Sequence, residues 1–146
     1  MQTEVEPDEH IKRVLRLLSV HKRWVMGMRV LVVDDSGFMR KRIVEELRAQ
    51  GHAVVGEAKG GNEAVQLYKS LKPDLVTMDI TMRDKDGITA AKEILQEDPQ
   101  AKILFVTILK DEKYRAEAEK LGAMGLVNKT DHLSIATIIG ELDQKR

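Results

Sequence analysis

The sequence predicts an α/β fold in which a parallel sheet carries helices on both faces. From Met28 onward, short apolar segments rich in β-branched residues alternate with longer segments whose apolar residues recur at helical spacing. Glycines and prolines separate these segments, as is typical of the turns between strands and helices. The alternation indicates right-handed βαβ units. Such folds bind their ligands at the carboxyl ends of the strands, so functional residues are expected there.

The expected strands are short apolar runs. The first is apolar at every position, which predicts that it is buried on both faces of the sheet. We expect strands at Val30–Val33, Ala53–Gly56, Leu75–Met78, Ile103–Val106 and Gly125–Val127.

The expected helices lie between residues that start or stop a helix. Ser36 is a good N-cap candidate for the first, and Gly51 follows its end. Lys59–Gly61 is expected to form a tight turn before the second, because it lacks the GKS/T pattern of a phosphate-binding loop. Pro73 follows the second, and Asp131 is a candidate cap for the last. We expect helices at Gly37–Gln50, Asn62–Leu71, Ile88–Gln96, Asp111–Leu121 and Leu133–Leu142.

Residues 1–27 differ from the rest and are expected to form an N-terminal extension. Ile11, Val14, Leu15 and Leu18 make one helical stripe, and acidic residues precede basic ones, as the helix dipole favours. An extra helix packed on the domain is one interpretation, and a dimerising or partner-binding helix is another. The predicted division is therefore an extension at 1–27 and one domain at 28–146.

The composition excludes several classes of function. The 24 basic and 24 acidic residues balance, so nothing indicates binding to nucleic acid or to an anionic membrane. The chain has no cysteine, which excludes disulfides and thiolate chemistry. No apolar run is long enough to span a bilayer, and the acidic N-terminus does not resemble a signal peptide. A cytoplasmic protein is expected.

Polar residues that suit a metal site follow the predicted strands. Asp34 and Asp35 end the first strand, Asp79 ends the third, Thr107 the fourth, and Lys129 follows the fifth. Parallel strands bring these ends to one edge of the sheet. Carboxylates so close to a core are costly without a cation, and oxygen ligands without His or Cys favour Mg²⁺. Magnesium is therefore the expected cofactor.

This set of residues predicts phosphoryl transfer. A carboxylate can attack phosphorus and form an acyl phosphate, and the transferred group needs little more than positioning and offsetting positive charge. Asp79 is the expected nucleophile, with Asp34 and Asp35 holding Mg²⁺. Lys129 is expected to pair with the phosphoryl group, and Thr107 to hydrogen-bond it.

Four motifs resemble response-regulator receiver domains of the CheY type. VVDDS, MDITM..KDG, FVT and GAMGLVNK occur in that family's order and spacing, from about Met28 to the C-terminus. The resemblance implies a flavodoxin-like, doubly wound sheet of five strands in the order 2-1-3-4-5. It also implies that a histidine kinase phosphorylates Asp79 in the presence of Mg²⁺. Asp34, Asp35, Asp79 and the main-chain carbonyl of Thr81 would then bind the metal.

The sequence departs from the family pattern at four positions. Arg83 and Thr130 stand where the family usually has proline, which bears on the stiffness of the loop after Asp79 and on a cis bond. Ile108 replaces a small residue and is expected to stand beside the phosphorylation site and narrow access to it. Leu126 replaces an aromatic residue that often rotates during switching.

The leading hypothesis is a single-domain response regulator rather than an enzyme, with chemotaxis as the expected process. Its expected partners are a sensor histidine kinase, an output protein such as a flagellar motor switch component, and a phosphatase. A phosphorelay shuttle and a receiver-like scaffold without turnover are alternatives. A magnesium-dependent phosphohydrolase of the haloacid dehalogenase type is a further one, although it would need an aspartate where Thr81 stands.

Overall fold

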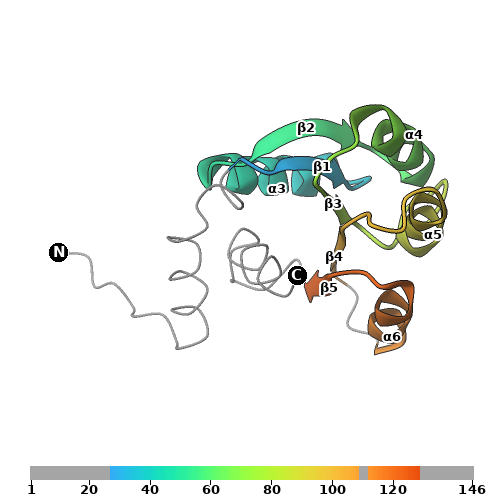
Figure 1. The fold of residues 1–146 in the computed structure, drawn as a ribbon. Coiled ribbons are helices and arrows are strands. Elements are labelled where there is room, and N and C mark those ends of the chain that lie inside the picture. The colour runs from blue at the N-terminus through green and yellow to red at the C-terminus, as the bar shows by residue number, and fades with distance from the viewer. Residues whose placement is uncertain (1–26, 109–111, 129–146) are drawn as a thin grey trace, which may run out of the picture.

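Five parallel strands form a single sheet in the order β2-β1-β3-β4-β5 (Figure 1). The computed structural model describes residues 27–108 and 112–128. The strands are β1 (Arg29–Val33), β2 (Ala53–Ala58), β3 (Leu75–Met78), β4 (Ile103–Thr107) and β5 (Gly125–Asn128). The predicted fold class and strand order are confirmed. The change of direction in strand order falls between β1 and β3, where ligand sites of such sheets lie.

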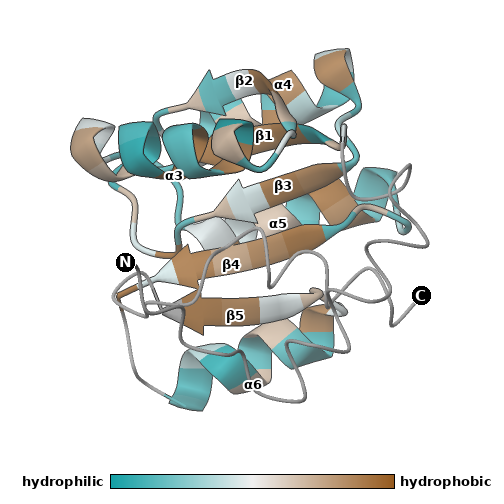
Figure 2. Ribbon diagram, turned by 90° about the vertical axis from the view of Figure 1, so that its left-hand side faces the viewer, coloured by the Kyte–Doolittle hydropathy of each residue, from teal (hydrophilic) through white to brown (hydrophobic). Residues whose placement is uncertain are grey.

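Four helices accompany the sheet in the described part of the chain. They are α3 (Gly37–Ala49), α4 (Gly61–Leu71), α5 (Gly87–Glu97) and α6 (Glu112–Leu121). Helix α3 packs on one face of the sheet and the other three pack on the opposite face, as Figure 2 shows. The expected N-terminal helix and the expected helix at Leu133–Leu142 lie outside the described residues.

The two faces of the sheet bury separate apolar cores. In β1, Leu31 and Val33 face the core shared with α4, α5 and α6, whereas Val30 and Val32 face the core shared with α3. All four are at most 1% exposed, which accounts for the unbroken apolar run in the sequence. Burying each such side chain stabilises the fold by about 1.5–3 kcal/mol, so the two cores fix the position of the strand ends.

Strand β2 contains a register shift that the sequence does not predict. Val30 pairs with Val54, but Leu31 pairs with Gly56, so one residue of β2 is extra. Regular pairing then continues to Val33 and Ala58, two residues beyond the expected end of the strand. The shift aligns the end of β2 with the end of β1.

The turn chemistry agrees with the expectations. The Ser36 hydroxyl accepts a hydrogen bond of 3.3 Å from the Met39 N–H and caps α3, as predicted. Lys59 and Gly60 bend into α4 as expected, but the helix begins at Gly61, one residue earlier than predicted. Among the described helices, none combines the length and the apolar character needed to cross a membrane.

Candidate functional site

Three aspartates meet where β1 and β3 end. Asp34 and Asp35 follow β1 and Asp79 follows β3, and because these strands are neighbours the residues beyond them lie side by side. One carboxylate oxygen from each lies within 4.8 Å of the others. Asp34 is fully buried and Asp79 is 7% exposed, whereas Asp35 is exposed. The structure thus brings together the three acidic side chains that the sequence placed at this edge.

Hydrogen bonds from neighbouring residues fix both the main chain and the side chain of Asp34. Its N–H donates to the carbonyl of Ala58 over 3.1 Å, and its Oδ1 accepts from the Ser36 N–H over 2.9 Å. Arg40, one turn into α3, donates from Nη1 to the Asp34 carbonyl over 2.8 Å and from Nε to Glu57 over 3.1 Å. Arg40 therefore joins α3 and β2 to the acidic edge.

The role of Arg40 in supporting the acidic edge was not predicted from the sequence. The signal was available, because a residue in the second turn of a helix that follows a strand end can reach back to that end. Its positive charge also offsets part of the local negative charge.

The backbone around Asp79 is equally constrained. Its N–H donates to the Val33 carbonyl over 3.0 Å, and its Oδ1 accepts from the Ile80 N–H over 2.9 Å. The Gly87 N–H donates to the Ile80 carbonyl over 2.7 Å. A Cβ atom on Gly87 would lie 1.9 Å from the Asp79 carbonyl oxygen. Only glycine permits the start of α5 to approach Asp79 this closely.

The other predicted site residues have mixed outcomes. Thr107 is fully buried at the end of β4, on the same edge as the aspartates. Thr81 is exposed, two residues beyond Asp79, and its contact with a metal stays a prediction. Lys129 and Thr130 lie outside the described residues, so their roles also stay predictions.

Three of the four departures from the family pattern fall on described residues, and one of them, Arg83, is exposed in the loop after Asp79. Ile108 follows Thr107 and is 62% exposed, which leaves it accessible to an approaching molecule. Whether it narrows access to Asp79 stays a prediction. Leu126 is half-buried and packs against the core formed with α4, α5 and α6.

The aspartate cluster fits a hard divalent cation. All of its donors are carboxylate oxygens, and two of the three side chains are buried. Two carboxylate charges separated by 4.8 Å, the upper limit of the oxygen separations in the cluster, repel each other by about 3 kcal/mol at an effective dielectric constant near 20. A cation offsets this repulsion, and Mg²⁺ accepts one or two carboxylates while keeping several waters.

Comparison with known proteins decides the family. A family model described as the response regulator receiver domain matches residues 30–139, most of the chain. The chain belongs to the response-regulator receiver family. CheY-like members are signalling proteins rather than enzymes in the usual sense, and receiver domains bind Mg²⁺ at an acidic pocket.

Individual relatives are similar over most of their own length. Chemotaxis protein CheY of Thermotoga maritima is 48% identical to this receiver domain over 104 residues, covering 71% of this chain and 87% of that protein. Chemotaxis protein CheY of Bacillus subtilis is 46% identical over 104 residues, with the same two coverages of 71% and 87%.

A solved structure shows the same fold. The crystal structure of the CheX-CheY-BeF3-Mg+2 complex from Borrelia burgdorferi contains a chain that matches with a TM-score of 0.73 and 30% identity. That match covers 82% of this receiver domain and 90% of the solved chain.

Proposed function

We propose that this receiver domain is a response regulator that accepts a phosphoryl group on Asp79 in the presence of Mg²⁺ and acts in chemotaxis. The observation that carries the proposal is the cluster of Asp34, Asp35 and Asp79, whose carboxylate oxygens lie within 4.8 Å of one another. Its position, at the change of strand order between β1 and β3, is where folds of this class bind ligands.

In the proposed reaction a carboxylate oxygen of Asp79 attacks the phosphorus of a phosphohistidine on the kinase. The new P–O bond forms as the P–N bond breaks, and the histidine nitrogen keeps the electron pair and takes up a proton. Bound Mg²⁺ would supply positive charge to the phosphoryl oxygens. Asp34 and Asp35 would hold the metal with Asp79 and the Thr81 carbonyl, while Lys129 and Thr107 would contact the phosphoryl group.

The surroundings of Asp79 suit a nucleophile that must not move. Its main chain is bound on one side to Val33 and on the other by the close approach of Gly87. Its Oδ1 accepts a hydrogen bond from the Ile80 N–H, which orients the carboxylate. Positioning of this kind contributes much of the rate in phosphoryl transfer, where little covalent chemistry is left to the protein.

The proposed partners follow from the relatives. Both CheY relatives are named as chemotaxis proteins, which supports a sensor histidine kinase upstream and an output protein such as a flagellar motor switch component downstream. The Borrelia burgdorferi CheY was solved in a complex with CheX, BeF3 and Mg²⁺, and a regulatory protein of that kind, acting as a phosphatase, is proposed here as a third partner. The cytoplasmic location stays a prediction.

Phosphorylation of the intact chain with acetyl phosphate tests the proposal. With Mg²⁺, mass spectrometry should find one added phosphoryl group as acetate leaves, and peptide mapping should place it at Asp79. Asp79→Asn should abolish the addition, and so should a chelator. Glu45→Gln, an exposed acidic position on α3, serves as the matched control and should be labelled like the wild type. Labelling of the Asp79→Asn protein, or labelling without a divalent cation, would overturn the proposal.

A further inference from the structure

Helix α4 lacks an N-cap side chain of its own. Ser36 caps α3 and Asp86 caps α5, but the residue at the N-cap of α4 is Gly60, whose main chain is extended at φ −169°. The first N–H groups of a helix have no partner within it, and a capping side chain normally satisfies them. For α4 the partner must come from elsewhere.

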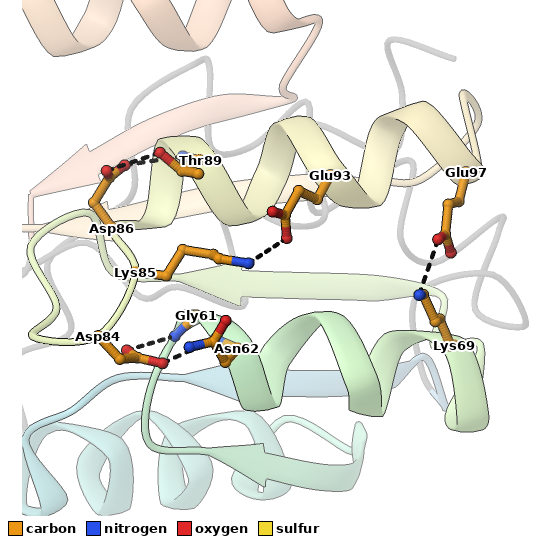
Figure 3. A network of polar contacts seen from close by, with 9 residues as sticks. All are labelled: Gly61, Asn62, Lys69, Asp84, Lys85, Asp86, Thr89, Glu93 and Glu97. Carbon is orange, nitrogen blue, oxygen red and sulfur yellow. Dashed lines mark hydrogen bonds and ion pairs between the residues drawn. The ribbon is translucent and has the colours of Figure 1, made fainter.

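Asp84 supplies the missing cap from the loop that follows Asp79. Its Oδ1 accepts from the Gly61 N–H over 3.1 Å and its Oδ2 accepts from the Asn62 N–H over 3.0 Å, as Figure 3 shows. These hydrogen bonds, led by the one from Asn62, hold the pKa of the Asp84 carboxyl below its usual value. The positive end of the helix dipole favours the same charge.

The loop after Asp79 fits against the start of α4 only because the N-cap residue Gly60 and the first helical residue Gly61 are both glycines. A Cβ atom on Gly60 would lie 2.4 Å from Asp84 Oδ1, and one on Gly61 would lie 2.5 Å from the Lys85 carbonyl oxygen. The loop of residues 80–86 therefore sits directly against the start of α4.

Further contacts anchor the same loop on its other side. The Lys85 ammonium pairs with Glu93 of α5 over 2.5 Å, and Asp86 accepts from both the N–H and the hydroxyl of Thr89 (Figure 3). At the start of the loop, the Ile80 carbonyl accepts from Gly87. Between these fixed ends lie Thr81, Met82 and Arg83.

We propose that Asp84 is a positioning residue for the metal site, because its cap on α4 fixes the loop that presents Thr81 beside Asp79. This inference rests on the proposed function, in which the Thr81 carbonyl completes the metal shell. Arg83, which stands where the resemblance leads one to expect proline, has no ring to restrict the loop. The Asp84 cap restrains the loop through contact with a neighbouring helix instead.

Asp84 stabilises α4 as a helix cap, and this role must be separated from its proposed role in positioning the loop. Asp84→Ala removes both the cap and the link. Gly60→Asn combined with Asp84→Ala restores only the cap, because asparagine at this position can accept from the helix N–H groups. The three atoms nearest to a Cβ on Gly60 all belong to the Asp84 carboxylate, so the alanine makes room for the asparagine.

Calorimetric Mg²⁺ titration and metal-free unfolding by denaturant distinguish the two roles. Asp84→Ala should lower both the Mg²⁺ affinity and the stability. The double variant should recover the stability, while its Mg²⁺ affinity stays about 10-fold below that of the wild type, the effect typical of lost supporting contacts around a metal. Lys69→Ala is the matched control, because it breaks the exposed ion pair of 2.9 Å with Glu97 at the other end of α4 and α5. It should leave the Mg²⁺ affinity unchanged.

Hydrogen exchange gives an independent readout. Because coupling between two sites is reciprocal, Mg²⁺ should slow exchange of the Gly61 and Asn62 amides in the wild type. The Asn62 amide of the double variant should not respond. A double variant with full Mg²⁺ affinity would overturn this inference alone and leave Asp84 as a helix cap. Wild-type protein that binds no Mg²⁺ would overturn the proposed function and this inference with it.

Discussion

Asp35→Ala should separate the electrostatic role of the aspartate cluster from its role in packing. Asp35 is the exposed member of the cluster, so its removal opens no cavity in the core. It takes part in two of the three carboxylate pairs, each with oxygens within 4.8 Å. We expect the variant to be more stable than the wild type without metal and to lose the stabilisation by Mg²⁺.

The magnitudes follow from the geometry. At 4.8 Å a pair of unit charges repels by about 1 kcal/mol in a water-like medium, and this lower limit suits an exposed side chain. Removing Asp35 should therefore raise the metal-free unfolding free energy by about 1–2 kcal/mol. In the wild type, Mg²⁺ at about tenfold its dissociation constant should contribute about 1.4 kcal/mol. That corresponds to a rise in Tm of about 5 °C.

Thermal unfolding followed by far-UV circular dichroism measures both effects. Samples with and without Mg²⁺ should be matched in ionic strength with sodium chloride, so that general screening does not imitate metal binding. Glu45→Ala removes an exposed charge away from the cluster and should retain the full response to Mg²⁺. If Asp35→Ala still shows the wild-type rise in Tm with Mg²⁺, the aspartates do not form the metal site. If the variant is less stable than the wild type without metal, repulsion among the carboxylates does not destabilise the metal-free protein.

Substitutions at Gly87, His52 and Ile108 each test one further part of the structure. Gly87→Ala should destabilise the fold by at least the roughly 1–3 kcal/mol typical of overpacking and should reduce labelling of Asp79, because its Cβ would lie 1.9 Å from the Asp79 carbonyl oxygen. A variant that unfolds at the same denaturant concentration as the wild type would contradict this. His52 is 5% exposed, its Nδ1 has no hydrogen-bond partner among the described residues, and burial lowers its pKa below 6.5. Its stabilising effect is therefore complete above about pH 6.5 and lost as the pH falls through the folded-state pKa, so the stability advantage over His52→Gln should shrink from pH 7 to pH 5; a constant difference would refute this. Ile108→Ala should leave the unfolding free energy nearly unchanged, since the side chain is 62% exposed, and should speed both gain and loss of the aspartyl phosphate in quenched-flow measurements if this side chain narrows access; unchanged rates would show that it does not.

Periodic features of the chain were predictable from the sequence. Continuous apolar runs and helical spacing located the strands and helices of the described region, and the strand order followed from the family resemblance. The gathering of Asp34, Asp35 and Asp79 was predictable for the same reason, since neighbouring parallel strands must end at one edge. Boundaries were less accurate. Strand β2 continues past Gly56 because Glu57 binds Arg40 and the Ala58 carbonyl binds Asp34, and neither contact is a local pattern.

The supports of the site could not be predicted in this way. The cap on α4 joins Asp84 to backbone groups 22 and 23 residues earlier, across a loop without periodicity. The contact between Gly87 and Asp79 depends on the same loop path. From the sequence, Gly60 is expected only in a tight turn. The lack of a capping side chain at this position indicated that another segment of the chain could cap the helix that follows.

The extra residue in β2 also affects whether strands of two molecules can pair at the edge of the sheet. Among the described strands β2 pairs only with β1, so its other side is an edge at which a strand of a second molecule could add. The register shift bends this edge, and Glu57, which is ion-paired with Arg40, places charged groups on the strand. A straight, uncharged edge would favour pairing with a strand of another molecule. The irregular path of β2 opposes such pairing.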